Sequence, residues 1–211
     1  MNTLPRLSSL FSVVGRLADF RLMMAAVAFG LLSAPAAQAQ ADATNLAPNG
    51  NLETPNAAGD WAANWGKPKI GQSSWEVDGA DHFIRMKATE PGKMMMIYNQ
   101  VAVRGAKAVE LGIRARVSEL KKGTSSWFDA RVMVGFRDSA SKEIKGATKQ
   151  IVFGKNTAGW EEKKVSFAVP EGTVFLAIMP SLFNVEAGTF DFSEVTVKAI
   201  DPATLPAPAA K

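Results

Sequence analysis

The stretch WFDARVMVGFRD, residues 127–138, alternates between apolar and polar side chains along its whole length. One set of alternate positions is apolar: Phe128, Ala130, Val132, Val134 and Phe136. The other set is mixed and mostly polar: Trp127, Asp129, Arg131, Met133 and Arg137. Successive side chains of a β-strand point to opposite faces, so a period of two predicts a strand with one face buried.

The same alternation recurs on both sides of this stretch. Residues 109–117 place Val109, Leu111, Ile113, Ala115 and Val117 on one face and Glu110, Arg114 and Arg116 on the other. Residues 165–169 repeat the pattern. Near the end of the chain, Phe190 and Phe192 share a face, but the next core positions are Val195 and Val197. This change of parity predicts a β-bulge between the two pairs.

Turn-forming residues separate these runs, as at Asp78-Gly79, Glu90-Pro91-Gly92, Lys122-Gly123 and Pro170-Glu171-Gly172. Roughly nine short strands at this spacing indicate two antiparallel sheets packed face to face. The predicted fold class is therefore all-β, a two-sheet antiparallel β-sandwich. We expect one such domain over residues 40–200.

The first 39 residues have the features of a signal peptide. Three arginines precede the apolar run Leu22–Leu32, and Ala37-Gln38-Ala39 follows as a small-x-small cleavage site. An 11-residue apolar run is shorter than the roughly 20 residues that a membrane-spanning helix needs. The sequence therefore predicts a periplasmic or secreted protein that does not stay in the membrane after cleavage. The Pro/Ala-rich residues 201–211 are expected to form a disordered tail.

Composition excludes several classes of function. The chain has no cysteine, which excludes a disulfide scaffold, a thiolate metal site and a cysteine nucleophile. Its formal net charge is +4, and the predicted signal peptide holds three of its 24 basic residues. The remaining chain is close to balanced and has no long Lys/Arg block, so nucleic-acid binding is not expected.

Several short sequence motifs along the chain resemble those of a known group of modules. The opening run is Asn45-Leu-Ala-Pro-Asn-Gly-Asn-Leu-Glu53, and Gly59-Asp60-Trp61 follows it. Gly159-Trp160 leads through Phe167 to Val169-Pro170, and Phe190-Asp-Phe-Ser-Glu-Val195 comes last. In this order they resemble the carbohydrate-binding modules of families 4, 9 and 22. The resemblance implies a jelly-roll sandwich of the galactose-binding-like class, and non-catalytic binding of a polysaccharide or oligosaccharide, often beside glycoside hydrolases.

The resemblance also implies a structural calcium ion, held between the opening glutamate and the last strand. Glu53 matches the first ligand, and carboxylate oxygens suit this hard cation. The Asp-Asp pair expected in the last strand is Ser193-Glu194 here, so the candidate ligands are Glu53, Asp191 and Glu194. The alternative is that Glu53 only forms hydrogen bonds with a neighbouring loop.

Sugar recognition requires aromatic faces for stacking and planar polar groups that bind neighbouring hydroxyls. Trp127, Asp129 and Arg131 share a face, and the turn at Lys121–Gly123 suggests that Arg114 and Arg116 lie beside them. Asn184 could join this surface, so the predicted ligand-binding residues are Trp127, Asp129, Arg131, Arg114, Arg116 and Asn184. The alternative is a solvated face whose ion pairs contribute about 0–1 kcal/mol each.

Three other groups are interpreted as packing: Trp61, Trp160 and the run Met94–Tyr98, which resembles a buried strand. Catalysis has little support, because His82 is the only histidine and no serine lies in a G-x-S-x-G motif. The predicted function is non-catalytic carbohydrate binding. The alternatives are a structural or adhesion protein of the cell envelope that binds another protein, and a small glycoside hydrolase or lyase.

Overall fold

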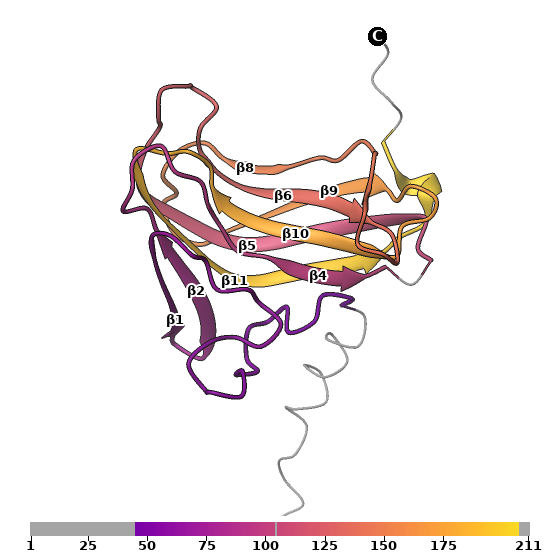
Figure 1. Ribbon diagram of the computed structural model, residues 1–211, viewed down its shortest axis with the longest axis horizontal. Coiled ribbons are helices and arrows are strands. Elements are labelled where there is room, and N and C mark those ends of the chain that lie inside the picture. The colour runs from indigo at the N-terminus through magenta and orange to yellow at the C-terminus, as the bar shows by residue number, and fades with distance from the viewer. Residues whose placement is uncertain (1–44, 104, 207–211) are drawn as a thin grey trace, which may run out of the picture.

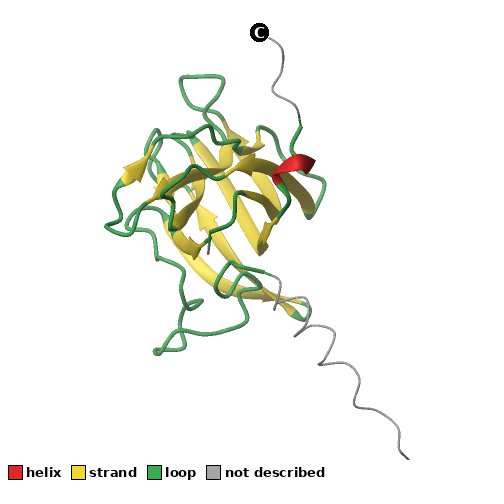
Figure 2. Ribbon diagram, turned by 90° about the vertical axis from the view of Figure 1, so that its right-hand side faces the viewer, coloured by secondary structure: helices red, strands yellow, loops and turns green. Residues whose placement is uncertain are grey.

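The computed structural model describes residues 45–103 and 105–206, which form two stacked antiparallel sheets (Figure 1). The predicted signal peptide lies outside the described residues. Strands form the body of the molecule and loops close its ends (Figure 2). The predicted all-β antiparallel sandwich is therefore confirmed.

One sheet has five strands in the order β1-β2-β11-β5-β9. Their bounds are Gln72–Asp78 (β1), Asp81–Lys87 (β2), Ala108–Lys121 (β5), Glu161–Ala168 (β9) and Ala187–Ala199 (β11). We refer to it as the five-stranded sheet. The register of β11 shifts between Phe192 and Glu194, where the sequence predicted a bulge. Because of this shift, Phe190, Phe192, Val195 and Val197 are all buried.

The other sheet has six strands, with β10 and β6 at its centre. β3 and β4 pair with β10, and β7 and β8 pair with β6. The bounds are Met95–Met96 (β3), Asn99–Ala102 (β4), Ala130–Arg137 (β6), Glu143–Ile144 (β7), Ile151–Phe153 (β8) and Phe175–Leu182 (β10). We refer to it as the six-stranded sheet.

The hydrophobic core lies between the two sheets. Val132, Val134 and Phe136 of β6 point into it, as the alternation of residues 127–138 predicted. Aromatic rings join the layers, since Phe136 packs 5.9 Å from Phe167 and Phe153 packs 5.6 Å from Phe190, measured between ring centroids. The opposite positions of each strand therefore face outward, and the two outer faces are where a ligand can bind.

The opening segment extends the five-stranded sheet alongside the second half of β11. The Asn45 side chain accepts a hydrogen bond from the Val197 N–H at 2.8 Å and donates one to the Val195 carbonyl at 2.9 Å. Gly50 allows this close approach, because a Cβ there would lie 2.2 Å from the Val195 oxygen. Trp61 and Trp65 are buried behind this segment, so the prediction that Trp61 packs in the core is confirmed.

The last element of the described residues is a short 3-10 helix, η1, over Pro202–Thr204, and the Asp201 side chain accepts a hydrogen bond from the Ala203 N–H at its start. The segment predicted to be disordered therefore begins with described structure over residues 201–206, and its last five residues lie outside the described range. In the described part of the chain, no helix has the length and hydropathy needed to cross a membrane.

Candidate functional site

The predicted ligand-binding residues do not share one surface. Arg114 and Arg116 belong to β5 in the five-stranded sheet, whereas Arg131 belongs to β6 in the six-stranded sheet. The prediction that they lie side by side was wrong, because the Lys121–Gly123 turn is not a hairpin. The connection between β5 and β6 instead crosses from one sheet to the other.

On the outer face of the five-stranded sheet, both predicted arginines are neutralised by carboxylates. Arg116 Nε lies 2.8 Å from Asp191 Oδ2, and Arg116 Nη1 lies 2.8 Å from Asp78 Oδ2. Arg114 Nη1 contacts Asp81 at 3.3 Å and the Ser193 hydroxyl at 3.1 Å. These contacts leave little unpaired positive charge on this face for an acidic ligand.

Two aromatic rings on the same face are covered by guanidinium groups. Arg114 and Arg116 lie 4.8 and 4.4 Å from the centroid of the Trp160 ring. Phe83 points outward but is only 2% exposed, because Arg85 and Arg116 lie over it at 5.1 and 5.0 Å. The predicted packing role of Trp160 is confirmed, and this face presents a closed cluster of ion pairs and cation–π contacts.

The ion pairs on this face shift two pKa values. Hydrogen bonds from the Trp160 indole and from Arg116 lower the pKa of Asp78 below its ordinary value of 3.8. Hydrogen bonding to Asp191 raises the pKa of Arg85. Both groups therefore stay charged at neutral pH, as expected for a structural cluster and not for an acid–base pair.

The outer face of the six-stranded sheet differs, because it carries an exposed tryptophan. Trp127 is 55% exposed and lies in the loop just before β6. Its ring packs 4.5 Å from Phe128 and 5.5 Å from Phe183, measured between centroids. Part of the Trp127 ring is thus held by its neighbours while the rest remains open to a ligand.

Asp129 and Arg131 support Trp127 and are not open to solvent. The sequence predicted both as outward ligands, but they are only 4% and 9% exposed. Arg131 Nε lies 2.6 Å from Asp129 Oδ1, while Nη1 donates to Gln150 Oε1 at 3.0 Å and Nη2 donates to the Trp127 carbonyl. The Arg131 guanidinium also lies 5.0 Å from the Phe183 ring centroid. These internal contacts use the guanidinium nitrogens of Arg131 that would otherwise bind a sugar. Asp129 and Arg131 are therefore supports for Trp127 and not outward ligand-binding residues.

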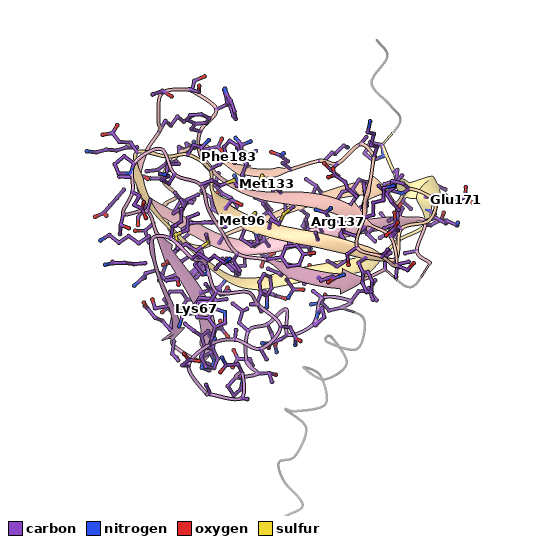
Figure 3. All side chains as sticks on the ribbon, in the orientation of Figure 1. Lys67, Met96, Met133, Arg137, Glu171 and Phe183 are labelled. Atoms are coloured by element: carbon purple, nitrogen blue, oxygen red, sulfur yellow. The ribbon has the colours of Figure 1, made fainter. Side chains whose placement is uncertain are left out.

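Sequence reasoning missed most of the residues around Trp127. Met133 lies opposite Met179 in the ladder between β6 and β10, and Met96 and Arg131 both lie opposite Ser181. Figure 3 marks Met96, Met133 and Phe183 over this sheet. We define the Trp127 face by these outward side chains: Met96, Tyr98, Gln100, Trp127, Met133, Met179 and Phe183.

The run Met94–Tyr98 is not a fully buried strand, contrary to the interpretation from sequence. Met95 and Ile97 are buried, whereas Met94 and Tyr98 are each 38% exposed. Exposed and buried positions alternate through this run, as in other half-buried strands. The alternation cannot be read from the sequence, because the residues on both faces are apolar or aromatic. Tyr98 therefore joins the candidate site as a second exposed aromatic ring.

Next to the methionines, the outer face of the six-stranded sheet carries small residues. Gly135 lies opposite Ala177, which in turn lies opposite Gln100. A Cβ at Gly135 would reach only ordinary contact distance, 3.8 Å, from the Ala177 Cβ and the Met179 methyl group. Small side chains thus separate Met133 from Arg137 along the outer side of β6, and Figure 3 labels both ends of this stretch.

Asn184 follows Phe183 at the end of the six-stranded sheet, in a left-handed conformation with φ of 49°. It does not lie on the sheet face with Trp127, but lines a hollow at the end of the sandwich together with Phe128. Of the six predicted ligand-binding residues, the structure therefore brings together Trp127, Asp129 and Arg131, places Asn184 nearby, and separates Arg114 and Arg116.

The three predicted calcium ligands do not meet. Glu53 Oε2 lies 2.7 Å from His82 Nδ1, and Glu53 Oε1 accepts the His82 backbone N–H at 3.0 Å. Asp191 is held by Arg85 and Arg116, and Glu194 borders a separate shallow hollow with Lys164 and Lys198. Among the described residues, no three acidic or histidine side chains are grouped for a metal. The predicted ligand set does not fit the ion.

Glu53 instead fixes the β1–β2 hairpin, which is the alternative left open by the sequence. His82 stacks on Trp75 with ring centroids 4.5 Å apart, and the Trp75 indole donates a hydrogen bond to the Leu52 carbonyl at 3.0 Å. His82 is therefore bound between Glu53 and Trp75. These contacts give His82 a packing role in the hairpin.

No family model matches this chain, and the search of curated proteins gave no match. Solved structures do resemble it. The enzymatically active domain of bacteriophage CBA120 tailspike protein 4 gives a TM-score of 0.55 at 14% identity, covering 74% of this chain and 22% of the tailspike chain. This chain thus spans about a fifth of the tailspike chain.

A family 4 carbohydrate-binding module, described as "CBM4 structure and function", gives a TM-score of 0.50 at 14% identity. The match covers 72% of this chain and 99% of the module. Identity this low establishes the fold and nothing finer. The chain therefore has the β-sandwich jelly-roll fold of a carbohydrate-binding module, as the sequence predicted.

Proposed function

We propose that this protein binds carbohydrate without catalysis, through the Trp127 face. The observation that carries the proposal is the exposed ring of Trp127, held beside Phe183 and anchored through its own carbonyl by Arg131. An indole ring fixed in this way loses little conformational freedom when a ligand stacks on it. The shared fold with a family 4 module supports the same function.

The proposed mechanism combines stacking with a small number of hydrogen bonds. Trp127 would stack on the apolar C–H face of one sugar ring, and Tyr98 would contact another ring farther along the sheet. Gln100 and Arg137 provide planar polar groups on the same outer face, suited to paired hydrogen bonds with hydroxyls. The ion pair of Arg137 with the exposed Glu143 is long, at 3.9 Å, and leaves its other guanidinium nitrogens for a ligand. Asp129 and Arg131 act through Trp127 and do not touch the sugar.

Export and a role beside glycoside hydrolysis complete the proposal. The predicted signal peptide, residues 1–39, would deliver the sandwich to the periplasm or the cell exterior. There it would capture a polysaccharide or oligosaccharide for uptake, or work next to a separate glycoside hydrolase. The seven side chains that define the Trp127 face include no charged group, which favours a neutral glycan over an acidic one.

A second candidate function is binding of another protein, as in an adhesion or structural role in the cell envelope. The observation that favours it is the methionine content of the Trp127 face, where Met96, Met133 and Met179 lie together. Methionine side chains are flexible and polarisable, which suits adaptable protein contacts better than sugar stacking. A protein partner would cover the whole face and not only its aromatic rings.

Affinity electrophoresis against a panel of neutral and acidic polysaccharides separates the two candidates. Carbohydrate binding predicts retardation of the wild-type protein by at least one neutral polysaccharide, lost in Trp127→Ala and partly kept in Trp127→Phe. Met133→Ala should have a smaller effect, because sulfur does not provide a flat stacking surface. Unretarded migration in every gel would reject carbohydrate binding and leave the protein-binding candidate.

A further inference from the structure

A hollow of about 520 Å³ lies at the end of the sandwich, next to the Trp127 face. Three loops form it: the one before β3, the crossing between β5 and β6, and the link from β10 to β11. Its lining residues are Pro91, Gly92, Gly123, Thr124, Phe128, Asn184 and Glu186. The volume falls within the range of roughly 300–1,000 Å³ that is usual for small-ligand sites.

Backbone contacts hold the three loops in place. The Gly92 N–H donates to the Val185 carbonyl at 2.9 Å, and the Glu186 N–H donates to the Lys121 carbonyl at 2.9 Å. Gly123 lies so close to the neighbouring loop that a Cβ there would come within 2.4 Å of the Asn184 carbonyl oxygen. The hollow is therefore built by fixed main-chain geometry and does not depend on a flexible lid.

The side chains that line the hollow are complementary to a sugar. Thr124, Asn184 and Glu186 make no side-chain hydrogen bond within residues 45–103 and 105–206, so a hydroxyl, an amide and a carboxylate are available to a ligand. The Phe128 ring adds an apolar wall. A pyranose has this combination of surfaces, with hydroxyls at its rim and an apolar C–H face.

We propose that this hollow is a subsite for one neutral sugar ring of the glycan that stacks on Trp127. The inference rests on the proposed function and extends it. Phe128 lines the hollow and packs 4.5 Å from Trp127, so a chain lying on the Trp127 face can continue past this ring into the hollow. The carboxylate of Glu186 would repel a uronate, which is why the ring is neutral.

Isothermal titration calorimetry with cello-, xylo-, manno- and β-1,4-galacto-oligosaccharides of two to six units tests the subsite. For the series that binds, Asn184→Ala and Glu186→Gln should each weaken the affinity roughly three- to tenfold, the effect of losing one or two hydrogen bonds. Glu171→Gln is the matched control, since Glu171 lies toward the opposite end of the molecule from Phe183 (Figure 3). It should bind like the wild type. Unchanged thermal unfolding of each variant confirms that its fold is intact.

The outcomes separate the subsite from the proposed function. If the wild type binds and Trp127→Ala weakens binding, but Asn184→Ala and Glu186→Gln match the control, the subsite is rejected and carbohydrate binding stands. If no oligosaccharide and no polysaccharide binds the wild type, both proposals are rejected. A selective loss in the two hollow variants establishes the subsite.

Discussion

At the scale of single residues, Trp127 depends on the buried arginine beneath it. Arg131 uses its three nitrogens on Asp129, on Gln150 and on the Trp127 carbonyl, so it fixes the loop from below. Its role is to position the ring. The sequence indicated that Arg131 lies on the outer side of its strand, but nothing in the alternation reveals that its contacts with Asp129, Gln150 and Trp127 cover it there.

This arrangement predicts the effect of replacing Arg131 with leucine. The substitution leaves the Asp129 carboxylate buried without its partner, so we expect a loss of about 3 kcal/mol in the free energy of unfolding. The part of the near-ultraviolet circular dichroism that belongs to Trp127, identified as the part that Trp127→Phe removes from the signal of the five tryptophans, should weaken as the loop becomes mobile. The double replacement Asp129→Leu with Arg131→Leu should recover stability but not the dichroism signal. Full recovery of that signal would show that Trp127 does not need the arginine.

The lowered pKa of Asp78 predicts how the stability of the fold changes with pH. Its pKa is lowered in the folded protein by the Trp160 indole and by Arg116, so its ordinary value of 3.8 applies only after unfolding. A lowered pKa stabilises the fold fully above pH 3.8, and this contribution is lost as pH falls through the lower folded value. Denaturant midpoints of the wild type and Asp78→Asn should therefore differ most above pH 4 and converge in stronger acid. A constant difference across this range would contradict the assignment.

At the scale of elements, the period-two pattern predicted which way each strand faces, but not to which sheet it belongs. Parity correctly separated Val132 from Arg131 and placed the bulge after Phe192. Both sheets of a sandwich have an outer face, however, so two polar sets of equal parity can lie on opposite sides of the molecule. The crossing between β5 and β6 has the same Lys-Gly turn chemistry as a hairpin, and this is why Arg114 and Arg131 were wrongly joined.

The contacts that hold the β1–β2 hairpin also could not be predicted from the strand pattern. The resemblance assigned Glu53 to a metal, whereas Glu53 binds both the backbone and the ring of His82. Glu53→Ala should cost about 1 kcal/mol in unfolding free energy and speed amide hydrogen exchange at His82. Glu53→Gln, which keeps an acceptor for the N–H, should exchange more slowly than Glu53→Ala. Equal exchange in all three proteins would mean that Glu53 does not hold the hairpin.

At the scale of the whole molecule, the two outer faces differ in what they leave open. The five-stranded sheet covers its aromatic rings with Arg85, Arg114 and Arg116 and pairs those cations with carboxylates. The six-stranded sheet leaves Trp127 and Tyr98 exposed above a methionine floor. This asymmetry supports the proposal that carbohydrate binds on the Trp127 face and not on the five-stranded sheet.

The most direct test compares one variant on each face. The dissociation constant for a polysaccharide that retards the wild type should be measured for Trp127→Ala and for Arg114→Ala. Binding by Trp127→Ala should be at least about tenfold weaker, since removing a central stacking ring costs on the order of 1.4 kcal/mol or more. Arg114→Ala should bind like the wild type, because Arg114 lies on the five-stranded sheet, away from the Trp127 face. Equal loss in both variants, or loss only in Arg114→Ala, would contradict the assignment of binding to the six-stranded sheet.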